Sequence, residues 1–161
     1  MYICNKNNYT LKRQGFIMEN DIKLLIDGLN EDLSHEYGAV VQYTYSASVV
    51  SGLYRSALKP FFEAEISDEQ GHALYLSEKI KSLGGTPTTK VAEVPQPTEV
   101  RDLLEAALQS EKDTIKRYDK RIKQADALGY TELVVKLEDL LSDETHHKEE
   151  IERLLEDPRI A

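Results

Sequence analysis

Apolar residues recur at intervals of three and four along four long segments of the chain, and this period predicts four amphipathic α-helices. In the first segment, for example, Leu25, Leu29 and Leu33 would share one face. We expect the helices over about residues 19–50, 60–83, 99–128 and 131–157. Each apolar face has to be covered by another helix, so the pattern predicts an all-α bundle.

Residues with special backbone preferences mark the expected ends of these helices. Pro60 suits the first turn of the second helix, and Thr98 and Thr131 are expected to cap the third and fourth. Gly84 and Gly129 suit the position just after a helix, where glycine tolerates a left-handed backbone.

The connections between the helices predict the topology. The first two helices, and the last two, are joined by short links and should form antiparallel pairs. The middle connection, from Gly85 to about Pro97, contains three prolines and cannot be helical throughout. Its ~13 residues can span about 43 Å, whereas the second helix is about 36 Å long. We therefore expect two antiparallel helical hairpins joined by a long crossover loop.

One acidic pattern occurs twice along these apolar faces, with the same internal spacing in both halves of the chain. Each half carries a Glu, a Tyr seven positions later, and then a Glu-x-x-His. The residues are Glu36, Tyr43, Glu69 and His72 in the first half and Glu111, Tyr118, Glu144 and His147 in the second. In each Glu-x-x-His the two side chains share one face of a helix, because positions i and i+3 are neighbours.

Four buried carboxylates need positive charge close by, and the apolar faces that we expect contain no Lys or Arg. Two divalent cations would offset the four negative charges, and two imidazoles would complete a ligand set typical of a two-metal site in a helical bundle. Carboxylate and imidazole ligands suit iron, with manganese and zinc as alternatives. The same charge argument predicts that Glu144→Gln leaves the metal-free protein at least as stable.

A single Glu-x-x-His would be weak evidence, since an acid stands three positions before every histidine of the chain. A solvated helix face explains one copy, but it does not explain a repeat on the buried faces. His35 and His146 are not expected to be ligands, because each is turned by about 100° from its neighbour in the repeat.

Four further residues are candidates for supporting roles. Asp68 and Asp143 precede the repeated Glu, and each is expected to accept the free N–H of a histidine. A solvent-facing position is the alternative for both. Tyr43 and Tyr118 could hydrogen-bond the carboxylates, donate an electron during catalysis, or simply belong to the core.

The composition argues against several classes of protein. The chain has 161 residues and a net charge of −9, which disfavours affinity for nucleic acid and suits attraction of cations. It has one cysteine and no apolar run that could span a membrane, so a cytoplasmic protein is expected. Residues 1–17 carry three basic residues and no acid. We expect a flexible N-terminal extension over residues 1–18, with contact to DNA as an alternative, and a single domain over 19–157.

With these residues in place, the sequence resembles the ferritin-like superfamily and is most similar to its bacterioferritin type. The resemblance covers about residues 19–157. It rests on the order and spacing of Glu36 with Gln42-Tyr43, Glu69-x-x-His72, Glu111 and Glu144-x-x-His147. It implies a ferritin-like four-helix bundle with a diiron site inside one subunit. In that site Glu69 and Glu144 would bridge the metals, with Glu36 and His72 on one ion and Glu111 and His147 on the other.

Three departures narrow the resemblance. Gln70 stands where bacterioferritins have the haem-binding Met, so no haem is expected. The chain ends at Ala161, soon after His147, without the short fifth helix that lines channels in ferritin cages, which argues against a closed iron-storing shell. Thr114 stands where rubrerythrins have a further Glu, which argues against their peroxidase activity. The DNA-protecting ferritins differ as well, because they place iron between subunits.

The resemblance implies a ferroxidase-type oxidoreductase that oxidises Fe(II) with O2 or H2O2, for iron storage or detoxification. Two Fe ions per chain and a homo-oligomer, a dimer or larger, are expected. One alternative is a diiron or dimanganese redox enzyme of peroxidase or oxidase type that keeps its metals as cofactor. Another is a metal-stabilised structural or DNA-associated protein without turnover.

Overall fold

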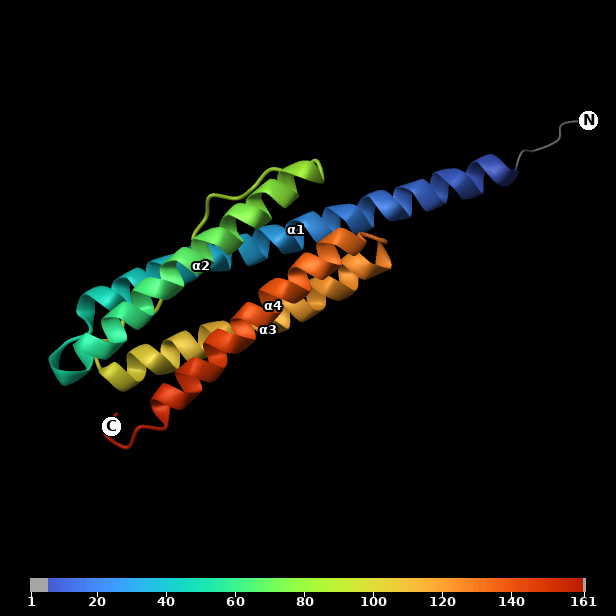
Figure 1. Ribbon diagram of the computed structural model, residues 1–161. Coiled ribbons are helices and arrows are strands. Elements are labelled where there is room, and N and C mark those ends of the chain that lie inside the picture. The colour runs from blue at the N-terminus through green and yellow to red at the C-terminus, as the bar shows by residue number, and fades with distance from the viewer. Residues whose placement is uncertain (1–5, 161) are drawn as a thin grey trace, which may run out of the picture.

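The computed structural model describes the backbone of residues 6–160 and the side chains from Met18 to Ile160. Four long helices and one short 3-10 turn make up the described part: α1 (Lys6–Val49), η1 (Gly52–Tyr54), α2 (Arg55–Ser82), α3 (Val100–Ala127) and α4 (Thr131–Leu155). Helix α1 packs against α2 and α3 against α4, and α1 also contacts α3 (Figure 1). The predicted bundle of two antiparallel hairpins is confirmed.

Helix α1 begins earlier than the sequence predicts. Its backbone is helical from Lys6, so most of the segment expected to be a flexible extension continues the first helix. Residues 1–5 lie outside the described part of the chain. Whether residues 6–18 move independently of the bundle stays a prediction.

Three of the expected helix starts were wrong in detail. The 3-10 turn η1 leads into α2 at Arg55, so Pro60 lies inside the helix rather than in its first turn. Helices α3 and α4 have Glu99 and Tyr130 at their N-caps, with no side-chain capping bond from either. Thr98 and Thr131 therefore do not act as caps, and packing of the apolar faces has to define these helix starts.

The two predicted glycine ends are correct. Gly84 and Gly129 have positive φ values of 86° and 75°. After each of them the backbone N–H of the next residue bonds back to the last helical turn: Gly85 donates to Ile80 at 2.9 Å, and Tyr130 to Ala125 at 3.0 Å. This bond pattern satisfies carbonyls that the end of a helix leaves free.

The crossover loop between α2 and α3 runs along the surface of α1 (Figure 1). The Asn30 side chain fixes its beginning, since its amide donates to the Thr86 carbonyl at 3.2 Å and accepts from the Thr88 N–H at 2.7 Å. The Ala92 N–H then bonds the Ser34 carbonyl at 2.9 Å, and the Tyr45 hydroxyl donates to Pro97 at 3.0 Å. The loop thus returns the chain to the end of the bundle where α2 began, and α3 runs parallel to α2.

The hydrophobic core has two parts. One contains Leu25, Leu29 and Leu33 of α1 with apolar residues of the other three helices. The other surrounds Phe62, together with Leu103 and Leu104 of α3. Both are fully enclosed, and between them the four helices turn polar side chains inward.

One buried ion pair was not expected from the sequence. Arg121 is 1% exposed and donates to both carboxylate oxygens of Asp32, at 2.7 and 3.2 Å. Gly28 makes the room, because a Cβ at this position would lie 1.6 Å from Arg121 Nη1. The core therefore does contain a cation, contrary to the sequence prediction, but Asp32 already offsets its charge.

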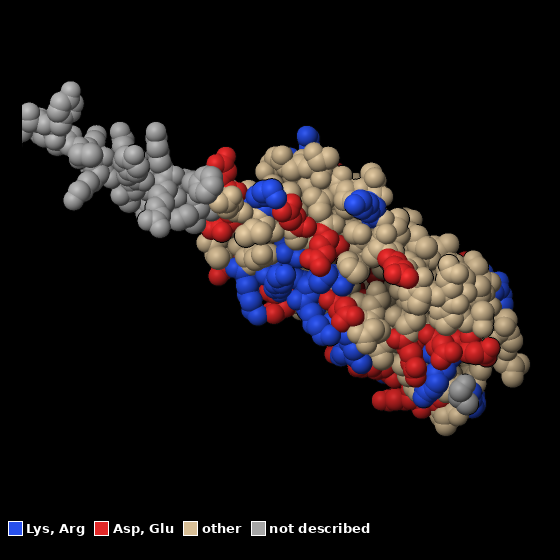
Figure 2. All heavy atoms as spheres, turned by 180° about the vertical axis from the view of Figure 1, so that it is seen from behind, with Lys and Arg blue, Asp and Glu red and all other residues tan. Residues whose placement is uncertain are grey.

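Charges on the surface are mixed. Figure 2 shows acidic and basic side chains interspersed on one face, beside a broad area without charged residues. Several form ion pairs within a helix, such as Lys23 with Asp27 at 2.8 Å. Within the described residues, none of the helices has a stretch long and apolar enough to cross a membrane.

Candidate metal centre

Each of the four helices contributes one glutamate to the space between the two parts of the core. These glutamates are Glu36 of α1, Glu69 of α2, Glu111 of α3 and Glu144 of α4, and none is more than 2% exposed. His72 and His147 follow on α2 and α4, each 6% exposed. The four glutamates and two histidines of the repeat therefore converge in the middle of the bundle.

The six side chains form two overlapping groups. Glu36, Glu69, His72 and Glu144 offer ligand atoms that all lie within 4.8 Å of one another, and so do Glu69, Glu111, Glu144 and His147. Glu69 and Glu144 belong to both groups. This is the division into shared and separate residues that the sequence resemblance implies. His35 and His146 belong to neither group.

The polar atoms in this space are suited to cations. Among the described residues, both oxygens of Glu69 and Glu144, one oxygen of Glu36 and the Nδ1 atoms of both histidines are buried without a hydrogen-bond partner. His72 Nδ1 comes within 3.0 Å of Glu144 Oε1, but the two atoms lack the alignment of a hydrogen bond. Unpartnered buried oxygens and nitrogens are costly, and two divalent cations would satisfy them.

Without metal, protons have to offset the charge. Burial and the neighbouring Glu144 raise the pKa of Glu69 well above its usual range, and burial does the same for the pKa of Glu111. Burial tends to lower the pKa of His147, but the carboxylates of Glu144 and Glu65 outweigh it and raise that pKa to about 10. The pKa of His72 is raised in the same way by Glu144, Glu36 and Glu69.

The pKa of Glu144 shifts in the opposite direction from those of Glu69 and Glu111. Burial favours its neutral form, yet contacts from Glu111, His147 and His72 lower its pKa below the usual value. Both Glu144 oxygens nevertheless lack a hydrogen-bond partner within the described part of the chain. That Glu144→Gln leaves the metal-free protein at least as stable stays a prediction.

The two tyrosines of the repeat hydrogen-bond the carboxylates across the halves. Tyr118 donates to Glu36 Oε1 at 2.7 Å, and Tyr43 donates to Glu111 Oε1. Both rings are buried, and each tyrosine belongs to the other half of the repeat from its glutamate. The hydroxyls hold two of the four carboxylates in orientation. Electron donation by either tyrosine stays a prediction.

The outer edges of the histidines face other acids. His72 Nε2 lies 3.7 Å from Asp143, and His147 Nε2 lies 3.8 Å from Asp68. Each aspartate thus faces the histidine of the opposite half, at distances longer than a hydrogen bond. Both aspartate side chains are more than half exposed, so direct acceptance of the histidine N–H stays a prediction.

Sequence reasoning missed Glu65. Its Oε2 lies 3.0 Å from His147 Nε2, and the residue is only 7% exposed. Glu65 lies one helical turn before Glu69 and so shares its helix face. That spacing was the available signal, but the matching position in the second half of the chain is not acidic, and the repeat did not reveal Glu65.

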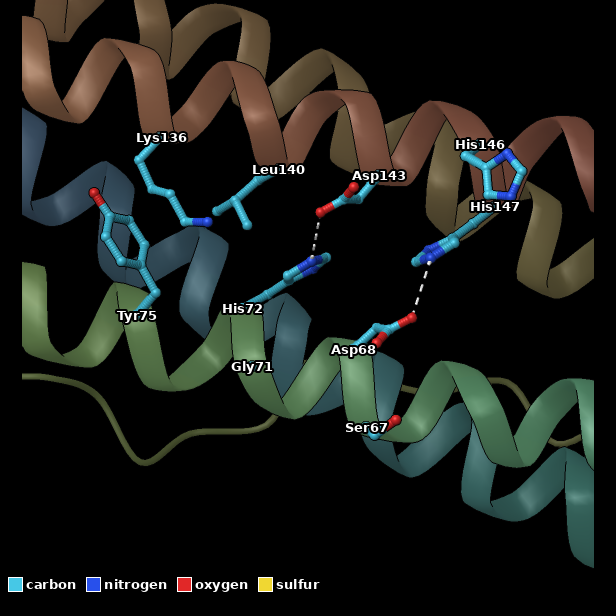
Figure 3. A pocket seen from close by; sticks show the side chains of 10 residues that line it. All are labelled: Ser67, Asp68, Gly71, His72, Tyr75, Lys136, Leu140, Asp143, His146 and His147. Atoms are coloured by element: carbon cyan, nitrogen blue, oxygen red, sulfur yellow. Dashed lines mark ion pairs between the residues drawn. The ribbon is translucent and has the colours of Figure 1, made fainter.

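A pocket of about 520 Å³ opens above the histidines between α2 and α4 (Figure 3). The edges of His72 and His147 line it together with Asp68, Asp143 and Lys136. The pocket reaches the outer edges of the two histidines, and polar and apolar groups line it in about equal measure.

Comparison with known proteins agrees with this geometry. The ferritin-like domain family matches residues 26–160. The chain belongs to the ferritin-like family. A bacterial ferritin of Neisseria meningitidis is 32% identical over 136 residues, which are 82% of this chain and 88% of that protein. A bacterioferritin of Streptomyces coelicolor is 29% identical over 133 residues, covering 82% and 80%.

Solved structures of this family have the same fold. A ferritin-like, diiron-carboxylate protein from Bacillus anthracis is 64% identical with a TM-score of 0.83, covering 84% of this chain and 97% of that chain. The bacterioferritin of Desulfovibrio desulfuricans, described with its diiron site in different catalytic states, is 25% identical with a TM-score of 0.80 and covers 86% and 81%. The buried carboxylate and histidine cluster of this chain is consistent with a diiron site.

Proposed function

We propose that this protein is a ferroxidase that binds two Fe(II) ions in the buried cluster and oxidises them with O2 or H2O2. The observation that carries the proposal is the pair of overlapping ligand groups that share Glu69 and Glu144. In this assignment Glu36 and His72 hold one ion, Glu111 and His147 hold the other, and the shared glutamates bridge them. Manganese or zinc would fit the same ligands.

The stoichiometry of the reaction is simple. Two Fe(II) ions give up one electron each, and together they reduce O2 to H2O2 with the uptake of two protons. With H2O2 as oxidant, the same two electrons and two protons yield two molecules of water. The metal supplies the redox chemistry. The protein holds the ions, and the Tyr43 and Tyr118 hydroxyls orient two of the ligand carboxylates.

The pocket favours iron handling over oxidation of an organic substrate. Asp68 and Asp143 stand at its rim beside the histidine edges and attract cations. An enzyme that oxidises an organic molecule would be expected to have an apolar channel next to the metals. A diiron or dimanganese redox enzyme of peroxidase or oxidase type that keeps its metals is the second candidate.

An oxidation titration tests the proposal. The apo protein is loaded anaerobically with increasing Fe(II), O2 is admitted, and the ferric iron that stays in solution is counted per chain. Rapid oxidation well beyond two irons per chain would support storage or detoxification. A stop at two would favour a fixed cofactor. Absence of any rapid oxidation would show that the chain is not a ferroxidase.

A matched pair of variants ties the activity to the cluster. Glu144→Gln removes a shared ligand and should abolish the rapid phase, whereas Glu149→Gln changes an exposed residue on the same helix and should leave it unchanged. Equal rates in the two variants would place the oxidation elsewhere. Assembly into a homo-oligomer is a separate expectation, which size-exclusion chromatography with light scattering can test.

A further inference from the structure

The two halves of the cluster are not equivalent at their outer edges. Both histidines direct Nδ1 toward the shared glutamates: His72 Nδ1 lies 3.5 Å from Glu69, and His147 Nδ1 lies 4.0 Å from it. The opposite nitrogens meet different surroundings. His147 Nε2 is 3.0 Å from the buried Glu65 carboxylate, whereas the carboxylate facing His72 Nε2 is that of Asp143, at 3.7 Å and half exposed.

The internal repeat shows where this difference comes from. The position that corresponds to Glu65 in the second half of the chain is Leu140, which lines the pocket next to His72 (Figure 3). Asp68 and Asp143, by contrast, correspond to each other and face the two histidines at nearly the same distance. A buried carboxylate partner is therefore present for one histidine, and an apolar side chain takes its place beside the other.

A carboxylate beside the outer nitrogen of a histidine changes how strongly that histidine binds a metal ion. It accepts the Nε2 proton, so the lone pair remains on Nδ1, and it makes that nitrogen more basic. Glu65 Oε2 lies 3.0 Å from Nε2 without the alignment of a hydrogen bond, and it attracts this proton by its charge, which is buried and poorly screened by solvent. The exposed Asp143 is farther away and surrounded by water, so its effect on His72 is weaker.

Positive charge lies at the other end of the pocket. Lys136 and Tyr75 lie on the side of His72 away from His147 (Figure 3), with the Lys136 ammonium 5.7 Å from the centre of the Tyr75 ring. A fixed cation on this side opposes a metal ion held by His72 more than one held by His147. Glu65 and Lys136 thus both favour the ion held by His147 over the ion held by His72.

We propose that the two metal positions differ in affinity, and that Glu65 is a positioning residue that makes the Glu111–His147 position the tighter one. That position fills first and keeps its ion. The Glu36–His72 position fills second and exchanges its ion with solvent through the pocket. The inference rests on the proposed two-metal site.

Anaerobic titration of the apo protein with Co(II), followed by the visible absorption of the bound ion, tests this order. We expect two steps whose dissociation constants differ by about 10- to 100-fold, the usual effect of a carboxylate placed beside a metal-binding histidine. In His147→Ala the tight step should disappear. In His72→Ala the tight step should remain and the weak step should disappear.

A sharper comparison replaces Glu65 and Leu140, in separate variants, by the residue found at the matching position of the other half. Glu65→Leu should weaken the first step by about 10-fold or more and bring it close to the second. Leu140→Glu should strengthen the second step. Glu63→Gln serves as a control, because Glu63 is an exposed carboxylate on the same helix that does not line the pocket, and it should change the first step by less than about 3-fold.

Each outcome has a defined meaning. Two steps of equal affinity in the wild type, or a tight step unchanged in Glu65→Leu, would overturn the inference while leaving the two-metal site intact. Failure of the wild type to bind Co(II) at the cluster would overturn the proposed function instead. If circular dichroism shows that Glu65→Leu is unfolded, Glu65→Gln keeps the shape of the side chain and should still weaken the first step alone.

Discussion

At the scale of single residues, the fold depends on how buried charges are paired. Arg121 and Asp32 form a closed pair beside the core, and Gly28 leaves the space that the guanidinium fills. The four glutamates of the cluster have no such cation among the described residues and rely on protons or metal. Pairing by Arg thus stabilises the bundle, whereas the unpaired carboxylates are available for metal ions.

Gly28→Ala should destabilise the protein, although alanine is normally the better helix former. The new methyl group would meet Arg121 Nη1 and displace it from Asp32, at a cost of about 1–3 kcal/mol. Gly71 is the control, because a Cβ there meets nothing within 4 Å. Gly71→Ala should stabilise by up to about 1 kcal/mol. Chemical denaturation measures both, and a stabilised Gly28→Ala would contradict the account of the pair.

At the scale of the elements, the sequence pattern predicted the number and order of the helices and their two glycine ends better than the helix starts or the orientation of α3. Leu108, Ile115 and Ile122 follow the apolar period along α3, but these side chains are only half-buried. The buried positions lie one residue earlier and include Ala107, Thr114 and Arg121. A small residue, a hydroxyl and a charged pair carry no apolar signal, so periodicity alone could not find this face.

The candidate site was more predictable than these details. A glutamate on an apolar face stands out from its neighbours, and the repeat supplied each half with its partner. Glu65 and the Arg121 pair lie outside the repeat, and recognising them requires knowing which helices face each other. The missed caps at Thr98 and Thr131 have another cause, since packing can define the start of a helix without any capping side chain.

The crossover loop is an element whose position depends on one side chain of α1. Asn30→Ala removes both hydrogen bonds to Thr86 and Thr88, and we expect a loss of about 1–2 kcal/mol in the free energy of unfolding. Hydrogen exchange of the Thr88 amide should accelerate markedly. Asn20→Ala, an exposed change on the same helix, is the control. Unchanged exchange at Thr88 would show that other contacts hold the loop.

At the scale of the whole molecule, metal and protons compete for the same groups. The folded pKa of His147 is raised from 6.5 to about 10. Its contribution to stability is therefore complete below about pH 6.5 and is lost as the pH rises toward 10. The raised pKa values of Glu69 and Glu111 act in the same direction. Metal ions replace these protons and remove the dependence.

As the pH rises from 6.5 to 10, the melting temperature of the metal-free protein should accordingly fall, while that of the Zn(II)-loaded protein should change much less. Metal binding should release protons, and binding should weaken as the pH falls. Calorimetric melting at several pH values, with and without Zn(II), measures both effects. A metal-free protein that gains stability over this range would contradict the protonated state of the cluster.

We expect six residues of the bundle to hold two iron ions. Diffraction at the iron absorption edge, from crystals grown anaerobically with Fe(II), locates bound iron without further assumptions. Two anomalous peaks are expected, one beside Glu36 and His72 and the other beside Glu111 and His147, with Glu69 and Glu144 between them. A single peak, or iron only at the outer group of Glu65, Asp68 and His147, would contradict this expectation.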